Sequence, residues 1–333
     1  MKRKLIFLAV MTALLSASSS VLFAQKGIKD YFKDQNGARA IGMGYAFTGV
    51  AEGLSTVLWN PAGLVSVTRP EVYFSRYQGF TYTTNDAVTG LETEDQISFN
   101  FFNFGMPIKE VGVLAVSMNL WDLGSSVFTN IGSEPTGFDD QSLWMFYGSY
   151  ATRLSKKVDI GVTMKYIREK LSSEAGGIGT SAALDVGVLY RPIDDVPLQI
   201  GAAIMDIGTD MQFKNEYQAD RLPRRVRIGA GYNILKHLLE QERFNLLLAV
   251  DYERFLVGSP QSDGIFIGTE FGIEPFEAML LSMRSGYLSE EGELSGALIG
   301  FGINYKGYSF DLARELGVNP LSDRTFFSVS AHF

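Results

Sequence analysis

The chain is 333 residues long, carries a formal net charge of −8 and contains no cysteine. Without cysteine, disulfide frameworks, thiolate metal sites and cysteine nucleophiles are excluded, and we expect no lipid-anchored amino terminus. The acidic balance argues against a nucleic-acid-binding protein, which needs a basic surface. Mean hydropathy is +0.06, and no long apolar run follows the first 25 residues. An α-helical membrane protein is therefore also excluded, because each span needs about 20 largely apolar residues.

Residues 1–24 have the three parts of a secretory leader. Lys2, Arg3 and Lys4 form a basic start, residues 5–15 are apolar, and residues 16–24 are mostly small. This order is typical of a signal peptide, and we expect cleavage after Ala24. The alternative is an uncleaved membrane anchor, for which the apolar stretch is short. We predict export, with a leader at 1–24, an amino-terminal segment at 25–70 and a strand-rich part at 71–333.

From about residue 71, apolar side chains recur at every second position in segments of about ten residues. One such row is Phe244, Leu246, Leu248, Val250 and Tyr252, with Ala249, Asp251 and Glu253 on the opposite parity. Alternation of period two predicts strands with one apolar face. Similar rows are Ile160, Val162, Met164, Tyr166; Leu184, Val186, Val188, Tyr190; Val226, Ile228, Ala230, Tyr232; and Ala297, Ile299, Phe301, Ile303, Tyr305.

These strands fit either a soluble β protein or a barrel in a lipid bilayer. Many rows end in tyrosine, as expected where aromatic rings meet the headgroup layer, and the opposite face is rich in glycine and charge. The connections also alternate in length, with short ones such as 107–110, 154–158, 191–197, 273–277 and 305–308. The long ones are 80–95, 122–141, 169–179, 208–223, 257–264, 288–295 and 315–324. One connection breaks the alternation, because 233–243 is long where a short turn is expected. Short turns inside and long loops outside favour an all-β fold, a transmembrane antiparallel β-barrel of about 14 strands.

Residues 30–64 do not alternate and are rich in glycine and other small residues. The simplest place for such a segment is inside the lumen, as an N-terminal plug against the glycine-rich inner wall. Gly42-Met43-Gly44 invites a dinucleotide-binding interpretation. That interpretation fails because Phe47 stands where the third glycine belongs and no buried strand precedes the motif.

Residues 37–50, followed by Trp59-Asn60-Pro61-Ala62-Gly63-Leu64, resemble the amino-terminal signature of the FadL superfamily, in its PorV/PorQ-like branch. The end of the sequence, an alternating strand that runs to Phe333, is also similar. The resemblance implies a fourteen-stranded barrel with an amino-terminal plug to which the motif Asn60, Pro61, Ala62 and Gly63 belongs. It also implies insertion into the outer membrane of a didermic bacterium by barrel-assembly machinery that recognises the Phe333 strand.

Signals for an enzyme are almost absent. The two histidines, His237 and His332, fall in a turn and in the last strand, so we expect no catalytic triad, no metal site and no cofactor. Asp251 and Glu253 share one strand face, which suggests acid–base chemistry but is more typical of a solvated lumen wall. Five charged residues form a candidate lumen cluster that either anchors the plug or binds a ligand carboxylate: Arg225, Arg227, Asp251, Glu270 and Arg284.

The resemblance leaves two functions open. One is transport of hydrophobic, long-chain fatty-acid-like small molecules across the outer membrane. The other is a PorV-like partner or shuttle role in type IX protein secretion. The expected partners are outer-membrane lipid, the assembly machinery, and either a hydrophobic ligand or secretion-system proteins.

Overall fold

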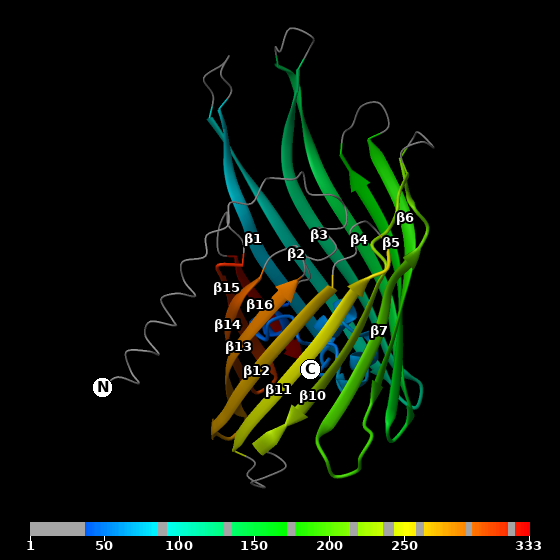
Figure 1. The fold of residues 1–333 in the computed structure, drawn as a ribbon, viewed down its shortest axis with the longest axis vertical. Coiled ribbons are helices and arrows are strands. Elements are labelled where there is room, and N and C mark those ends of the chain that lie inside the picture. Colours follow the sequence, from blue (N-terminus) through cyan, green and yellow to red (C-terminus); the bar gives the residue numbers. More distant parts are fainter. Residues whose placement is uncertain are drawn as a thin grey trace, which may run out of the picture.

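Fourteen long strands close into one antiparallel barrel in the computed structural model (Figure 1). The structure describes residues 37–85, 92–129, 135–171, 177–213, 219–235, 243–257, 263–290, 295–318 and 324–333. The strands are β1 (Glu71–Asn85), β2 (Glu92–Ile108), β3 (Gly112–Thr129), β4 (Pro135–Ser155), β5 (Val158–Lys170), β6 (Ile178–Tyr190), β7 (Leu198–Gly208), β8 (Met211–Gln212), β9 (Ala219–Asp220), β10 (Arg225–Asn233), β11 (Phe244–Phe255), β12 (Asp263–Phe276), β13 (Met279–Glu290), β14 (Ser295–Tyr305), β15 (Tyr308–Leu316) and β16 (Thr325–His332).

The barrel closes where the first strand meets the last. β1 pairs with β16 from Glu71 opposite His332 to Gln78 opposite Thr325, and β7 pairs directly with β10. The two-residue strands β8 and β9 pair with each other, and β8 also pairs with β6. Closure matters in a bilayer because an open sheet edge would leave backbone groups without hydrogen-bond partners in hydrocarbon. The predicted fourteen-stranded barrel is confirmed.

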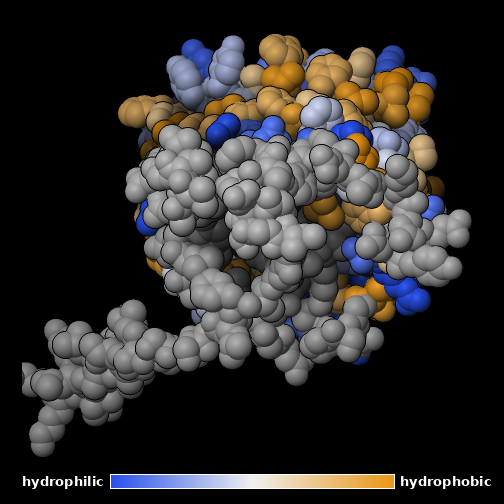
Figure 2. Space-filling model, turned by 90° about the horizontal axis from the view of Figure 1, so that it is seen from above, coloured by the Kyte–Doolittle hydropathy of each residue, from blue (hydrophilic) through white to orange (hydrophobic). Residues whose placement is uncertain are grey.

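The outer face of the wall is apolar and the inner face is polar or small. On β11, Leu248 and Val250 are 39% and 49% exposed, whereas Asp251 between Val250 and Tyr252 is 1% exposed. Seen from above, hydrophobic residues are abundant along the part of the outer wall that is not hidden by grey atoms (Figure 2). This is the inverse of a soluble sandwich and the arrangement of a barrel whose outside contacts lipid.

Exposed tyrosines lie at two levels of the outer wall. Tyr190 pairs with Val158 near the short turns, and Tyr166 lies eight residues further along β5. At about 3.3 Å per residue this separation is about 26 Å along the strand. Two aromatic levels on either side of an apolar band are what the two headgroup layers of a membrane require.

Several predicted long connections are wrong in extent, because the strands continue into them. β1 and β2 extend through most of residues 80–95, and β3 and β4 through most of 122–141. Glu315, expected in a loop, lies in β15 and is fully buried. The sequence pattern failed here because apolar alternation marks only the part of a strand with one apolar face. Polar strand ends pair equally well through their backbones.

The plug, residues 37–70, lies inside the lower half of the barrel in Figure 1. It contains the short helix α3 (Ala38–Gly42) and two 3₁₀ helices, η1 (Leu54–Leu58) and η2 (Pro61–Ser66). The predicted lumen plug is therefore confirmed. The predicted leader, residues 1–24, and His237 lie outside the described residues. Within the described ranges, no helix is long and apolar enough to span a membrane.

Candidate functional site: the plug and the lumen wall

The predicted plug motif forms a tight turn that is bonded to the wall. Asn60 is fully buried and caps η2, because its side-chain Oδ1 accepts a hydrogen bond of 3.2 Å from the Ala62 backbone N–H. Pro61 follows at the first helical position, where its missing N–H costs nothing. The Asn60 side-chain amide donates to the carbonyls of Thr48, at 3.1 Å, and Val188 of β6, at 3.0 Å. One asparagine therefore shapes the turn and ties it to β6.

Glycines on the lumen wall give the plug the room that it needs. A Cβ atom at Gly187 would overlap the Asn60 side chain, and one at Gly161 would overlap the backbone of Pro61. On the opposite wall, a Cβ at Gly286 would overlap the backbone of Gly44. Other wall glycines on which a Cβ would meet the plug are Gly201, Gly229, Gly231, Gly268 and Gly300. The plug backbone therefore touches the wall backbone on both sides of the lumen.

Arg227 and Asp251, two of the predicted charges, form hydrogen bonds to the plug. Asp251 accepts from the backbone N–H groups of Phe47, at 3.0 Å, and Thr48, at 2.7 Å. Arg227 donates to the Tyr45 carbonyl, at 2.7 Å, and to the Thr48 hydroxyl, at 2.9 Å. The Arg227 guanidinium also lies 5.1 Å from the ring centroid of Trp59, another plug residue. We call Arg227, Asp251 and Glu253, which pairs with Arg227 at 3.0 Å, the anchor cluster.

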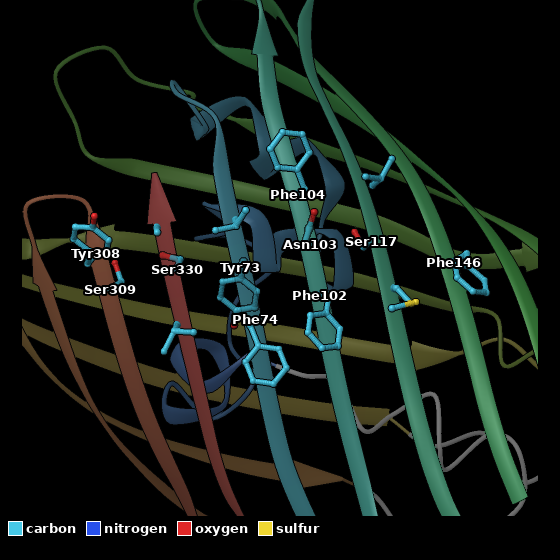
Figure 3. Close-up of a pocket in the computed structure, with 15 residues that line it drawn as sticks. Tyr73, Phe74, Phe102, Asn103, Phe104, Ser117, Phe146, Tyr308, Ser309 and Ser330 are labelled. Carbon is cyan, nitrogen blue, oxygen red and sulfur yellow. The ribbon is translucent and has the colours of Figure 1, made fainter. Parts of the chain in front are cut away.

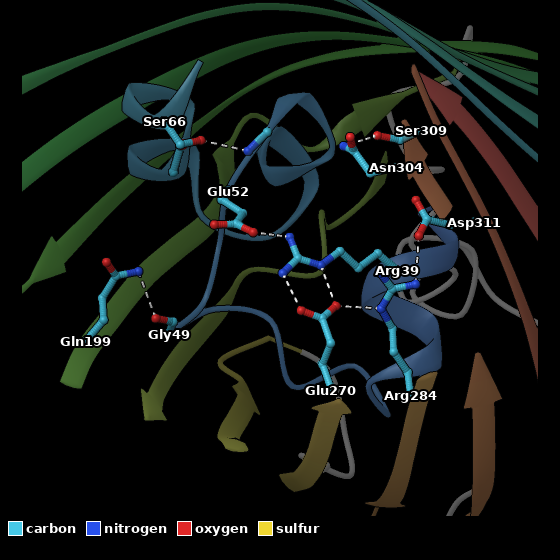
Figure 4. Close-up of polar contacts among 12 residues, drawn as sticks. Arg39, Gly49, Glu52, Ser66, Gln199, Glu270, Arg284, Asn304, Ser309 and Asp311 are labelled. Carbon is cyan, nitrogen blue, oxygen red and sulfur yellow. Dashed lines mark hydrogen bonds and ion pairs between the residues drawn. The ribbon is translucent and has the colours of Figure 1, made fainter. Parts of the chain in front are cut away.

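Glu270 and Arg284 form a second group of charges that reaches the plug through Arg39 (Figure 4). Arg39 of α3 donates from Nε, at 2.8 Å, and Nη2, at 2.9 Å, to the two carboxylate oxygens of Glu270. Arg39 also pairs with Glu52 of the plug, beside a polar cavity of about 480 Å³. Arg284 donates to Glu270 at 2.6 Å and to Asp311 at 2.7 Å. A bidentate guanidinium–carboxylate pair of this kind fixes orientation as well as charge.

Arg225, the fifth predicted residue, leads to a cluster that the sequence interpretation missed. Its Nε lies 3.7 Å from carboxylate oxygens of Asp206 and Glu253. Lys165 of β5 in turn contacts Asp185, at 2.7 Å, and Asp206, at 2.6 Å. Lys165 and Asp185 lie on the predicted inner face. Asp206 does not follow the alternation, because a register shift between β6 and β7 and a φ of 60° turn it inward.

A third buried group joins Tyr45 of the plug to Glu315 of β15 and to Arg324, which directly precedes β16. The Tyr45 hydroxyl donates to Glu315 at 2.8 Å, and Arg324 donates to the same carboxylate at 2.6 and 2.9 Å. Glu315 and Arg324 were missed because the sequence pattern places residues 315–324 in a long connection. Among the described residues, no group of three or more His, Asp or Glu is arranged to hold a metal ion.

An apolar hollow of about 800 Å³ lies on the outer wall, over β1 to β4, β15 and β16 (Figure 3). We call it the outer hollow. Phe74, Phe102, Phe104, Val116 and Val329 line it, and Asn103 and Ser117 of the inner face contribute to its floor. Strand pairing beneath it is continuous, from Glu71 to Gln78 between β1 and β2 and from Ser98 to Ile108 between β2 and β3. The hollow is therefore a recess in a closed wall.

Solved structures of two toluene transporters and a FadL homologue share this fold at low sequence identity. The P. putida toluene transporter TodX is 12% identical with a TM-score of 0.56, and the match covers 90% of this chain and 99% of that one. The Ralstonia pickettii toluene transporter TbuX is 11% identical with a TM-score of 0.56, over 91% and 100%. A Pseudomonas aeruginosa FadL homologue is 9% identical with a TM-score of 0.54, over 90% and 98%. No curated protein matches the chain.

The closed wall, the outward apolar band and the plugged lumen define this protein as a plugged transmembrane β-barrel, with the same fold as the FadL homologue. Its family follows from the sequence match. The profile of the type IX secretion system protein PorV family matches residues 34–262, which is more than half of the chain, so the protein belongs to the PorV family. The predicted resemblance is confirmed.

Proposed function

We propose that this protein is a channel for hydrophobic small molecules in the outer membrane, and not an enzyme. The outer hollow carries the proposal, because it is a large apolar recess in the wall whose floor is formed by residues that also face the lumen. The fold shared with two toluene transporters and a FadL homologue supports it. Hydrophobic molecules such as long-chain fatty acids need a protein route because the polar outer layer of such a membrane opposes their entry.

The plug would close this route at rest. In this proposal Asn60, Pro61, Ala62 and Gly63 hold the turn of the plug, and the predicted charges anchor it instead of binding a ligand carboxylate. Contacts from Arg227, Asp251 and Glu270 to the plug support this choice. The leader at 1–24 would direct export, and the strand that ends at Phe333 would be recognised by the barrel-assembly machinery.

The test is uptake of a radiolabelled long-chain hydrophobe by cells whose own hydrophobe channel has been deleted. We expect expression of this protein to raise the uptake rate several-fold. Val116→Trp should reduce that gain, because Val116 lines the outer hollow and is 62% exposed. Ile299→Trp is the matched control, since Ile299 is 48% exposed on β14 and does not line the hollow. No gain over empty cells would contradict the proposal.

The second candidate is a partner role in type IX secretion, which the family match favours. The structure adds one observation. Pairing between β2 and β3 ends at Ser98 opposite Asp122. Pairing between β1 and β2 continues further, to Asn85 opposite Glu92. Pairing between β3 and β4 likewise continues, to Thr129 opposite Pro135. Two hairpins therefore rise separately beyond the barrel rim, and they offer backbone edges to a protein partner. Loss of protein secretion in a deletion strain, with hydrophobe uptake unchanged, would favour this role.

A further inference from the structure

One strip of the lumen wall carries polar atoms that the protein leaves without partners. Asn103 Oδ1, Ser117 Oγ and Asn119 Oδ1 accept or donate no hydrogen bond among the described residues, and all three side chains are at least 94% buried. Asn103 lies opposite Ser117 in the β2–β3 register, and Asn119 is the next residue on the same face of β3. We call these three residues the neutral strip. Such unpaired buried groups are rare and call for a bound molecule or water.

The neutral strip faces the plug on one side and aromatic rings on the other. Tyr73 lies opposite Asn103 on β1, and its hydroxyl is close to Gly37 of the plug. The indole Nε1 of Trp59 is also close to Gly37, and this atom has no hydrogen-bond partner among the described residues. One residue pair beyond Asn119 on the same face, Trp121 lies opposite Phe99. The ring centroid of Phe99 is 4.1 Å from that of Tyr77 and 4.5 Å from that of Trp121. Buried aromatic rings therefore lie next to uncharged hydrogen-bonding groups in this part of the wall.

The charges of the lumen do not favour an anionic ligand at this place. Six cations of the plug and inner wall each lie within 4.0 Å of a carboxylate, and together they contact eight carboxylates. The cations are Arg39, Lys165, Arg225, Arg227, Arg284 and Arg324. A fatty-acid carboxylate would have to displace one of these carboxylates, in a set of described ion pairs that already holds more carboxylates than cations.

We propose that the neutral strip is a binding site for the uncharged polar end of a hydrophobic molecule, such as a long-chain alcohol, whose apolar part lies on the adjacent aromatic residues. This inference rests on the proposed channel function and narrows its substrate class. A hydroxyl group can both donate and accept, so it can donate to one of the two amide oxygens and accept from the serine hydroxyl that the fold leaves unpaired. A pure hydrocarbon leaves them unpaired, and a carboxylate offers only acceptors to the two amide oxygens.

The test uses tryptophan fluorescence in the purified full-length protein. The chain has three tryptophans, and Trp144 lies on the outer wall at 43% exposure, so Trp144→Phe leaves only the buried Trp59 and Trp121. Quenching is titrated with 11-bromoundecanol, 1-bromoundecane and 11-bromoundecanoate, which differ in the polar end. We expect the alcohol to quench at a concentration about fivefold lower than the bromoalkane, as for one net hydrogen bond, and the anion to be weakest.

Ser117→Ala combined with Asn119→Leu should remove the advantage of the alcohol and leave quenching by the bromoalkane unchanged. The fold should tolerate this pair, because the two removed oxygens have no protein partner in the described structure and the only side-chain hydrogen bond lost is that between Asn119 and Tyr147. The control is Ser149→Ala on β4, whose buried hydroxyl pairs with Thr163 at 2.8 Å, and it should keep the preference.

Two results would overturn the inference. The first is equal quenching by alcohol and bromoalkane, or stronger quenching by the anion. The second is an alcohol preference that survives in the double variant, which would mean that the neutral strip holds only water. Either result leaves the proposed channel function intact. Absence of quenching by all three molecules would contradict the channel function as well.

Discussion

Gly286 of β13 shows how closely the plug and the barrel wall approach each other. A Cβ atom at this position would overlap the backbone N and Cα of Gly44, and Gly44 itself has a φ of 64°, which favours glycine. Single atoms at the wall therefore decide whether the plug can seat. The same holds at Gly161 and Gly187, which face the Asn60–Pro61 turn. Charge is thus only one of the two features that fix the plug, and the absence of side chains is the other.

Gly286→Val is expected to destabilise the seated plug by about 1–3 kcal/mol, the usual cost of forcing extra atoms into a packed interior. The measurement is limited proteolysis of the plug in the detergent-solubilised protein, read as the rate of cleavage within residues 37–70. Gly148→Val is the matched control, because nothing lies within 4 Å of a Cβ at that outward-facing position of β4. Equal cleavage rates for the two variants would contradict the close approach described here.

At the scale of elements, the plug is held by buried charged residues on four neighbouring strands and on β15. β10 and β11 supply the anchor cluster, β12 and β13 supply Glu270 and Arg284, and β15 supplies Glu315. Removing one partner of such a pair leaves an uncompensated buried charge, which costs more than the pair contributes. The plug therefore depends on each of these strands being in register.

Arg227→Met tests this dependence, because it removes the cation but keeps much of the apolar length. With Asp251 left without its cation and Glu253 left with Arg225 alone, at 3.7 Å, we expect a loss of about 3–5 kcal/mol in the stability of the seated plug. Faster hydrogen exchange of the Phe47 and Thr48 amides, which donate to Asp251, is the readout. Arg254→Met on β11 removes an exposed pair with Asp263 at 3.7 Å and should cost less than about 1 kcal/mol. Unchanged exchange in Arg227→Met would contradict the anchoring role.

The sequence allowed the barrel and its plug to be predicted, because alternation and glycine content are local features. Leu248 and Asp251 could be assigned to opposite faces by parity alone. Asp206 could not, since a bulge with positive φ turns it inward against the alternation. Glu315 was placed in a loop because strand ends that lack an apolar face give no period-two signal. Arg324 does lie just outside β16, and its pairing with Glu315 had no local signal. Pairings across the lumen, such as Tyr45 with Glu315, depend on the plug's path and have no sequence signal.

At the scale of the whole molecule, the protein is a barrel whose wall is closed and whose lumen holds the plug, residues 37–70. The wall is continuous through strand pairs from β1 round to β16. The plug residues Ala38, Ile41, Phe47, Trp59 and Asn60 are fully buried within it. A lumen filled in this way is expected to exclude small ions.

The most direct test of this account is ion conductance of single molecules in planar lipid bilayers. We predict that the intact protein conducts little, and that a variant lacking residues 37–66 forms open, ion-conducting pores. Heat-modifiable mobility on gels must show first that the deletion variant still assembles, as expected if the strands alone close the wall. An intact protein that already conducts like an open pore, with no change on deletion, would contradict the plugged barrel.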